Sequence, residues 1–491
     1  LNVEFPLITT FKRPTVKDMA NFIRKSRGII FEEIKPVEKK EYYPLASAQK
    51  RLFFLEQFEN IGVTYNMPTV LHVVGKLNIE RFEYAVNALI CRHETLRTSF
   101  HLIKNEPVQI IREIVNFKIE YYHCSDSPPL PVIKEFTRHF DLSVAPLLHV
   151  GIISLARDEY LLLYDLHHII GDGTSMGILT GDFEALYNSR GLLPLTLQYK
   201  DFSAWQNNLF ETGKIEKQAA YWLECFQGQI PVLNLPTDYP RPGNLSFVGK
   251  TIGITLESET ASALKQFCLD SGVTLYMSML AALNVLFYKY TRQNDIIIGT
   301  GIMGRSHHDL QRLIGMFVNS LALRNYPDKE KCYADFLKEV KQTCLDAFEN
   351  QDVQFEWLVD QLKIKRDPAH NPLFDVLLVV QNFETSTAFK NKNGSSTNEL
   401  KFSNYPMENK TSKFDLNFSV WENENTLKVT LEYASELFNP STAQKILSDY
   451  LDILGQLIKN KDIRLKEVTI SYSFQDAENV GLVAEDCEFG F

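Results

Sequence analysis

The chain has 491 residues, of which 45% are hydrophobic and 23% charged, a composition typical of a globular protein with two or more lobes. Its formal net charge of -10 gives no electrostatic reason to bind nucleic acid or an acidic membrane surface, and no apolar run is long enough to cross a membrane. Seven scattered cysteines without a C-x-x-C pair favour a reducing compartment and predict a cytoplasmic protein.

The first predicted elements are a short helix and a linker. The pattern "TVKDMANFIRKS" follows Pro14 and predicts a helix that ends near Gly28, and the charged stretch "EEIKPVEKKEYYP" predicts a linker. From Ser47 onward, hydrophobic periodicity predicts a dense succession of elements. The predicted strands are "TVLHVVGKL", "LLHVGIISL" and "EYLLLYDLHH", and the predicted helices are "NIERFEYAVNALICRH", "SMGILTGDFEALYNSR", "YKDFSAWQNNLF" and "KQAAYWLECF".

A segment rich in proline and glycine, "VLNLPTDYPRPGNLSFVG", divides the chain near its middle. The strands predicted beyond it are "KTIGITL", "DIIIGTG" and "FDVLLVVQNF", and the helices are "ASALKQFCLD", "YMSMLAALNVLFYKYT", "ADFLKEVKQTCLDAFEN" and "STAQKILSDYLDILGQLIK". The mixed order of strands and helices predicts an α/β or α+β fold in two halves of similar size.

Two candidate active-site patterns overlap between positions 164 and 179. The first is H-H-x-x-x-D-G, from His167 to Gly173, and the second is G-x-S-x-G, from Gly173 to Gly177. The second pattern is the nucleophile elbow of a serine hydrolase, with Ser175 as the nucleophile. Both patterns lie between a predicted strand and a predicted helix, so this context does not separate them.

Strand alternation distinguishes the two histidines. His168 shares a face of the strand with Tyr164, and His167 shares the opposite face with Asp165. One histidine can therefore face a substrate while the other packs inside. Asp172 is costly to bury without a cation, so we expect a distant arginine to pair with it and the carboxylate to brace the turn.

The hydrolase alternative has weaker support. An elbow serine sits immediately after its strand, whereas Ser175 lies inside the start of the predicted helix, where serine is a common capping residue. His307, His308 and His370 lie downstream and could complete a triad, so the alternative stays open.

The sequence predicts no metal and no bound cofactor. The stretch "GTGIMG" has the spacing of a dinucleotide-binding loop, but no clean crossover helix follows it. The second histidine pair, in "SHHDL", has no carboxylate or cysteine at the spacing of metal ligands. A turn and a solvated helix start explain these two stretches.

Seven stretches, taken in order, resemble the signatures of the condensation domain of nonribosomal peptide synthetases. Their order along the chain is far more specific than any one of them. They are "SAQKRLFFLEQ" from Ser47, "RHETLRTSF" from Arg92, "HHIIGDG" from His167, "YKDFSAW" from Tyr199, "IGMFVNSLALR" from Ile314, "NQDVQFE" from Asn350 and "RDPAHNPLF" from Arg366.

The resemblance implies a fold and a division of the chain. The expected fold is α/β (α+β), with two chloramphenicol-acetyltransferase-like lobes in a V-shaped pseudo-dimer and a tunnel between them. Residues 1–27 resemble the C-terminal end of a preceding peptidyl carrier domain, and 28–43 a linker. The N-terminal lobe is then 44–213, the C-terminal lobe 214–475, and 476–491 a linker toward an adenylation domain.

The resemblance also implies an activity of the kind used in antibiotic biosynthesis. An acceptor aminoacyl-thioester amine attacks a donor acyl or peptidyl thioester and forms a peptide bond. Both substrates arrive on the 4'-phosphopantetheine of partner carrier domains, one upstream and one downstream, while the domain itself holds no cofactor. An adenylation domain is the expected neighbour, and the domain is expected to be monomeric within a larger synthetase, with no nucleic acid or membrane partner.

Carried over by motif, the resemblance assigns roles to individual residues. His168 is the catalytic residue, which accepts a proton, orients the amine or hydrogen-bonds the tetrahedral intermediate. His167 is structural. Asp172 braces the loop with Arg305 as its partner from the second lobe, and Gly173 gives a tight backbone approach.

Two further residues and three alternatives complete the expectations. Arg97 and Asn319 are candidates for polar roles near the tunnel, and Gly171 stands where relatives often carry a small polar residue. A relative that epimerises amino acids shares the histidine motif, so it stays an alternative. The others are a hydrolase or thioesterase that uses Ser175, and a carrier-docking module without catalysis.

Overall fold

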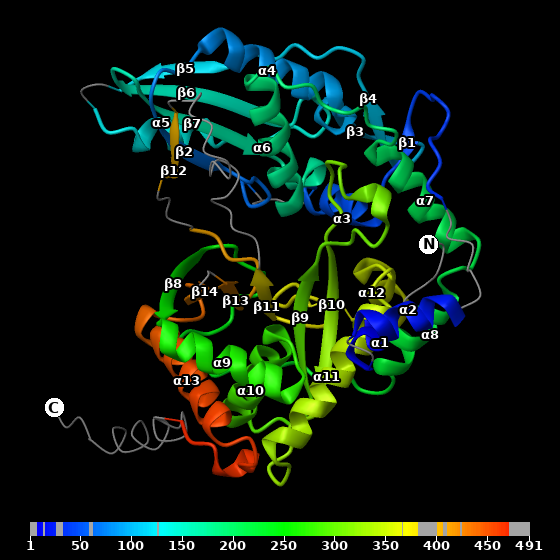
Figure 1. The fold of residues 1–491 in the computed structure, drawn as a ribbon, viewed down its shortest axis with the longest axis vertical. Helices are drawn as coiled ribbons and strands as arrows, with labels where there is room; N and C mark the ends of the chain where they lie inside the picture. The colour runs from blue at the N-terminus through cyan, green and yellow to red at the C-terminus, as the bar shows by residue number, and fades with distance from the viewer. Residues whose placement is uncertain are drawn as a thin grey trace, which may run out of the picture.

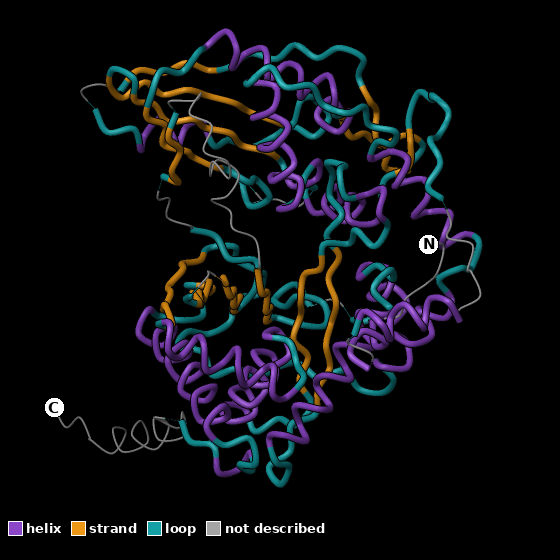
Figure 2. Tube along the Cα trace, viewed as in Figure 1, coloured by secondary structure: helices purple, strands orange, loops and turns teal. Residues whose placement is uncertain are grey.

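Two large mixed β-sheets, one of five strands and one of six, organise the chain into two lobes (Figure 1). Helices accompany the strands in both lobes, as Figure 2 shows. The predicted α/β class is therefore confirmed. The computed structural model describes residues 7–12, 15–25, 33–57, 62–124, 127–365, 367–381, 400–405, 410–422 and 425–470.

The five-stranded sheet of the N-terminal lobe has the order β12-β2-β7-β6-β5, in which β5 and β6 run parallel and the other neighbours antiparallel. Side chains alternate along β7, as predicted. Leu162 and Leu166 join the core beneath helices α4 and α6, and Leu161 and Leu163 join a smaller core beneath α5. The bounds are β2 (Thr69–Val74), β5 (Glu120–His123), β6 (Leu148–Ala156), β7 (Glu159–Leu166), β12 (Lys401–Asn404), α4 (Ile79–Arg92), α5 (Leu130–Phe136) and α6 (Gly173–Tyr187).

A small sheet and two helices complete the N-terminal lobe. Helix α3 is held against the histidine turn, because Gln49 Nε2 donates to the carbonyl of Ile169 at 3.2 Å. Helix α7 is tied to the small sheet by Ser203, whose hydroxyl donates to the carbonyl of Pro44 at 2.6 Å. The bounds are β1 (Tyr43–Pro44), β3 (Thr98–Ile103), β4 (Glu106–Ile111), α3 (Ser47–Leu55), α7 (Tyr199–Glu211) and the 3-10 turn η1 (Glu94–Arg97).

The six-stranded sheet of the C-terminal lobe has the order β10-β9-β11-β13-β14-β8, with β11 parallel to both of its neighbours. Helix α10 forms the centre of this lobe, and every residue from Met277 to Lys289 is buried, as expected for a helix apolar on all sides. The bounds are β8 (Gly249–Leu256), β9 (Ile296–Ile302), β10 (Asn319–Asn325), β11 (Val376–Gln381), β13 (Leu416–Glu422), β14 (Leu427–Ala434), α8 (Glu216–Cys225), α9 (Ser258–Ser271), α10 (Leu275–Thr291), α11 (Tyr333–Glu349), α12 (Phe355–Leu362), α13 (Pro440–Lys459), η3 (His308–Leu310) and η5 (Leu465–Glu467).

Within the described residues, no single helix has both the length and the apolarity to cross a membrane. Helices α9 and α10 reach that threshold only when taken together, and they bend by 100° where they meet.

Strand β12 departs from the predicted division of the chain. It lies within 214–475, the range assigned to the C-terminal lobe, but it pairs antiparallel with β2 of the N-terminal sheet. Phe402 of β12 lies opposite Val73 and packs against the N-terminal core. A strand of four residues carries too little periodicity to reveal such a long-range pairing.

The N-terminal helices α1 (Leu7–Lys12) and α2 (Val16–Lys25) precede the first lobe. The helix predicted after Pro14 corresponds to α2. Phe11 of α1 packs against the core of the C-terminal lobe, and its ring lies 5.2 Å from Nζ of Lys341 on α11. The carrier-domain assignment of 1–27 stays a prediction, and the predicted linker 476–491 lies outside the described residues.

Candidate functional site

The two histidines lie where β7 turns toward helix α6. The strand ends at Leu166, earlier than predicted, and a short 3-10 turn, η2 (His168–Ile170), precedes α6. The carboxylate of Asp172 caps the helix, because its Oδ1 accepts the backbone N–H of Ser175 at 2.7 Å. The strand thus fixes where the histidines leave the sheet, and the cap fixes where the helix starts.

His167 is buried and takes part in a structural contact. Its Nδ1 accepts the backbone N–H of Ile169 at 3.1 Å, so the ring proton lies on Nε2. Nε2 lies 3.1 Å from Oε1 of Glu56, and the other oxygen of this carboxylate lies 3.2 Å from Nε2 of His139. His167 therefore ties the turn to the end of α3. Sequence reasoning missed Glu56, since the spacing in "SAQKRLFFLEQ" does not distinguish it from a surface carboxylate.

His168 has a different environment and keeps part of its surface exposed. Its backbone N–H donates to the carbonyl of Tyr65 at 2.8 Å, and its Nδ1 lies 3.1 Å from Sδ of Met316. A thioether can only accept a hydrogen bond, so this contact places the ring proton on Nδ1 and leaves a lone pair on Nε2. Burial, followed by the charge of Lys413, lowers the pKa of His168 to about 3, so the imidazole is neutral at pH 7.

Asp172 forms a buried ion pair with Arg305 of the C-terminal lobe. Nη2 of Arg305 lies 3.1 Å from Oδ1 and 3.4 Å from Oδ2, and both side chains are 1% exposed. Nη1 donates to the carbonyls of Leu310 and Leu313 at 2.6 and 2.7 Å, and the guanidinium carbon lies 4.0 Å from the ring centre of Phe317. Burial lowers the pKa of Arg305, and the charge of Asp172 opposes that shift. The structure thus supplies the cation that the carboxylate needs.

Residues 314–317 of the C-terminal lobe lie against the N-terminal lobe, and each of them forms a hydrogen bond to it. The close approach requires a glycine, because a Cβ on Gly315 would lie 1.8 Å from the ring of Tyr199. The contacts are Thr95 Oγ1 to Ile314 O (2.9 Å), Ser175 Oγ to Gly315 O (3.0 Å), Gly315 N to Ser175 Oγ (3.1 Å), Tyr199 Oη to Met316 O (2.5 Å) and Phe317 N to Asp172 Oδ2 (3.1 Å). This segment brings Met316 to His168, so the site is assembled from both lobes.

Ser175 belongs to the same network and is completely buried. Its hydroxyl donates to Asp172 Oδ1 at 2.7 Å and accepts from Nη2 of Arg305 at 3.1 Å, besides its bonds to Gly315. A nucleophile needs an exposed oxygen and an adjacent base, and none of the partners of Ser175 is a histidine. His370, a candidate base, instead places its Nδ1 2.5 Å from Asp375 Oδ2. The structure gives no support to the hydrolase interpretation.

A fluorophosphonate probe is expected to leave Ser175 unlabelled, because the reagent cannot reach a hydroxyl that four hydrogen bonds enclose. Mass spectrometry of the peptide that contains Ser175 measures this. A trypsin-like protease labelled in the same tube controls for reagent activity. A phosphonylated Ser175 peptide from folded protein would contradict the expectation.

The glycines of the motif have other roles than the expected ones. Gly173 was expected to allow a tight backbone approach, but a Cβ there would meet nothing within 4 Å. The tight position is Gly171, where a Cβ would lie 2.5 Å from Cδ2 of Leu166. The prediction for Gly173 is therefore wrong, because α6 turns its first residue toward open space while the turn before it packs on the strand.

Arg97 and Asn319 do not join the histidines. Arg97 is the last residue of η1, and its side chain reaches back to α4, where Nε donates to the carbonyl of Ile90 at 3.0 Å and Nη2 to that of Cys91 at 3.3 Å. Asn319 is buried in the C-terminal lobe, where Nδ2 donates to the carbonyl of Val353 at 2.8 Å. Both side chains hold backbone segments, so the expected polar roles near the tunnel are not what their contacts show.

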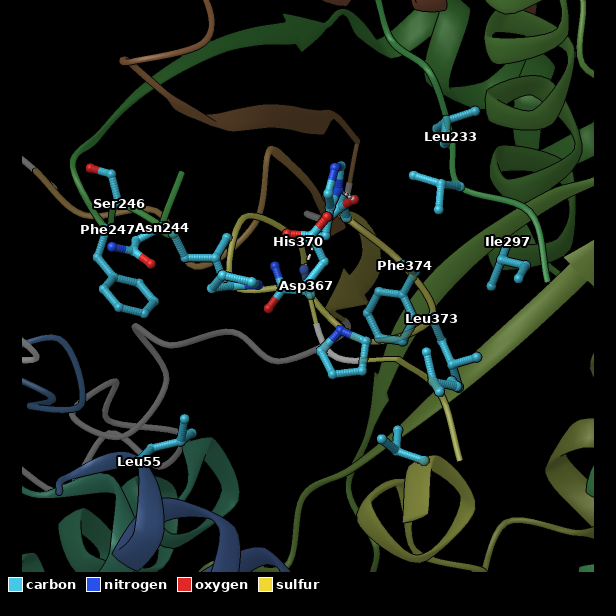
Figure 3. A pocket seen from close by; sticks show the side chains of 18 of the residues that line it. Leu55, Leu233, Asn244, Ser246, Phe247, Ile297, Asp367, His370, Leu373 and Phe374 are labelled. Carbon is cyan, nitrogen blue, oxygen red and sulfur yellow. Dashed lines mark hydrogen bonds and ion pairs between the residues drawn. The ribbon is translucent and has the colours of Figure 1, made fainter. Parts of the chain in front are cut away.

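A pocket of about 1120 Å³ lies between the lobes (Figure 3). Leu55, at the end of α3, contributes to its N-terminal wall together with Val63 and Thr64. Thr64 precedes Tyr65, whose carbonyl holds His168, so this wall adjoins the histidine turn. The opposite wall belongs to the C-terminal lobe and is formed mainly by residues 230–233, 244–248, 367–368 and 370–375.

No group of three or more histidine, cysteine or acidic side chains in the described part of the chain is arranged to hold a metal ion. Arg366, which begins the seventh motif, lies outside the described residues.

Comparisons with known proteins agree with this geometry. The family model named Condensation domain matches residues 39–479. The chain is 42% identical to bacitracin synthase 3 of Bacillus licheniformis over 487 residues, which are 97% of this chain and 8% of that protein. It is 44% identical to tyrocidine synthase 3 of Brevibacillus parabrevis over 468 residues, 95% of this chain and 7% of that protein. The chain thus spans less than a tenth of the length of these two relatives.

Among solved structures, a four-domain nonribosomal peptide synthetase bound to AMP and glycine superimposes with a TM-score of 0.81. The sequence identity is 19%, and the match covers 89% of this chain and 34% of that one. At this identity the likeness describes the fold alone.

Proposed function

This chain belongs to the condensation domain family, and from that premise we propose that it forms a peptide bond between two carrier-bound substrates. The amine of an acceptor aminoacyl thioester attacks the carbonyl of a donor acyl or peptidyl thioester. The tetrahedral intermediate collapses to an amide, and the donor carrier leaves as a thiol. The observation that carries this proposal is His168, a neutral imidazole at the junction of the two lobes, with a lone pair on Nε2 and part of its surface exposed.

The chemistry asks little of this imidazole. A thioester is already activated, and an α-amino group has a pKa of about 8, so an appreciable fraction is neutral near pH 7. A lone pair on Nε2 can accept a hydrogen bond from the attacking amine and orient it. A pKa of about 3 for His168 makes a fully protonated imidazolium a poor ground state, which favours orientation and hydrogen bonding over outright proton abstraction.

The remaining motif residues hold His168 in place. His167 and Glu56 fasten one side of the turn, and Asp172 and Arg305 fasten the other side to the C-terminal lobe. We assign them positioning roles, because these side chains bond to one another and to backbone groups of the turn and of residues 310–317. The lobe limits 44–213 and 214–475 belong to this proposal, with β12 crossing between the lobes.

Partners follow from the same proposal. The substrates arrive on the 4'-phosphopantetheine of an upstream and a downstream carrier domain, and an adenylation domain is the adjacent partner. The lengths of the relatives support this, since each contains far more chain than one such domain. The domain acts as one unit of a larger cytoplasmic assembly.

A two-carrier assay tests the activity. The chain is mixed with a donor carrier loaded with an L- or D-aminoacyl group and an acceptor carrier loaded with an L-aminoacyl group. Intact-protein mass spectrometry should find dipeptidyl thioester on the acceptor carrier, with more product from the L-donor. Epimerised donor without dipeptide would favour the epimerising relative instead. Free amino acid released from the donor carrier, without dipeptide, would favour a thioesterase.

A further inference from the structure

Lys413 extends from the C-terminal lobe to Tyr65 of the other lobe. It precedes β13, in a segment whose Lys410 and Thr411 line the interlobe pocket. Its Nζ lies 4.6 Å from the ring centre of Tyr65, the residue whose carbonyl accepts the backbone N–H of His168 at 2.8 Å. Tyr65 therefore contacts the ammonium of Lys413 through its ring and the backbone of the proposed catalytic residue His168 through its carbonyl.

Among the residues that the structure describes, no carboxylate forms an ion pair with Lys413, whose ammonium lies over the face of the Tyr65 ring. The charged groups that act on it are Glu432 of β14, which favours the ammonium, and Arg51 of α3, which opposes it. Burial has the largest effect and lowers the pKa of Lys413 to about 8, so the side chain is still mostly cationic at pH 7.

A second effect connects Lys413 with His168. After burial, the charge of Lys413 is the next cause of the lowered pKa of His168, ahead of the charge of His167. A cation in this position also lowers the pKa of any amine that comes next to His168, because protonation would give that amine a positive charge. The same cation stabilises an oxygen that becomes negatively charged.

We propose that Lys413 is a positioning residue of the condensation site, whose positive charge keeps the incoming amine unprotonated and favours negative charge on the thioester oxygen during attack. The inference rests on the proposed function and adds a residue from the second lobe to its site. The geometry behind the inference is that Nζ of Lys413 lies 4.6 Å from the ring centre of Tyr65, and the carbonyl of the same tyrosine holds the backbone of His168. Because the lysine belongs to the C-terminal lobe, the effect also depends on how the lobes are held together.

The test compares Lys413→Met and Lys413→Arg with the unchanged chain in the two-carrier assay between pH 6 and pH 10. Methionine keeps the length and removes the charge, and we expect turnover at pH 7 to fall roughly tenfold or more, with the acidic limb of the rate profile shifted to higher pH. Arginine keeps the charge, so most turnover should return at pH 7. Arginine should also preserve turnover above pH 8, where the lysine loses its proton.

A matched control is Lys341→Met, because Lys341 also lies over an aromatic ring, that of Phe11, but at the outside of the C-terminal lobe. This variant should behave as the unchanged chain does. Thermal unfolding of all variants separates loss of fold from loss of charge. Superimposable pH profiles for Lys413→Met and the unchanged chain would overturn the proposal, and so would failure of a folded Lys413→Arg to recover turnover.

A second readout does not depend on activity. The imidazole of His168 can be titrated by NMR, and its pKa should rise in Lys413→Met and return toward the original value in Lys413→Arg. If the unchanged chain forms no dipeptide, the proposed function fails while this titration still measures the electrostatic contact. If dipeptide forms and the His168 titration does not move in Lys413→Met, the inference alone fails.

Discussion

Replacing His168 with alanine is expected to lower turnover in the two-carrier assay by about 10²–10⁴-fold, the range typical of losing a group that orients or exchanges a proton. The imidazole is partly exposed at the lobe junction and carries a lone pair on Nε2, and alanine offers neither. The measurement is single-turnover formation of dipeptidyl thioester.

The pH profile of this variant carries a further expectation. With a pKa of about 3, His168 does not change charge between pH 6 and pH 9. His168→Ala should therefore lower the rate across that range without altering the shape of the profile, which the amine and Lys413 set. His72→Ala is the matched control, since His72 lies on β2 of the same sheet and pairs with Glu159 at 2.7 Å, away from the turn. Undiminished product from His168→Ala would remove His168 from the mechanism.

Much of the fold follows from local periodicity in the sequence. The predicted helices correspond to α2, α4, α6 to α11 and α13, because each carries an apolar face or a wholly apolar core segment. Strand β7 was predicted two residues too long. Its alternation continues to His168, but the regular strand ends at Leu166, and beyond it only an isolated bridge pairs His167 with Asn66. Tertiary contacts, rather than propensity, set that boundary.

Long-range pairing accounts for what periodicity could not give. β12 joins the sheet of the other lobe, and residues 314–317 bond to η1, to α6 with its cap Asp172, and to α7 of the N-terminal lobe. A single sequence shows neither, because each contact joins segments more than 100 positions apart. The motifs still marked the right stretches, since "IGMF" and "HHIIGDG" are the two segments that meet.

The site residues also fall into those that the sequence revealed and those that only the structure revealed. The motif named His167, His168 and Asp172, the need for a buried counter-ion predicted a distant arginine, and the resemblance named Arg305, which the structure pairs with Asp172. Glu56 and Lys413 carried no comparable signal. In the sequence, a lone carboxylate at a helix end and a lone lysine before a strand resemble ordinary surface residues. Folding of the N-terminal lobe brings Glu56 to His167, and the C-terminal lobe brings Lys413 to Tyr65. A site at a lobe junction takes residues from both halves of the chain, so neither half of the sequence reveals all of them.

Replacing Arg305 with methionine is expected to destabilise the protein by about 3–5 kcal/mol, the usual effect of removing one partner from a buried ion pair. The carboxylate of Asp172 would keep its bonds to Ser175 and Phe317 but would lose its counter-ion in a place where it is 1% exposed. The carbonyls of Leu310 and Leu313 would lose their donors as well. Urea denaturation followed by tryptophan fluorescence measures the loss.

The pair also ties the lobes, so the same variant should reduce turnover beyond its effect on stability. Asp172 holds Phe317, and the residue before Phe317 is Met316, which contacts His168. Arg190→Met is the matched control, because Arg190 and Glu184 form an exposed ion pair whose loss typically costs at most about 1 kcal/mol. In the double variant Asp172→Asn with Arg305→Met, no charge is left unpaired, so part of the lost stability should return. If Arg305→Met unfolds at the same urea concentration as Arg190→Met, the pair does not hold the lobes together.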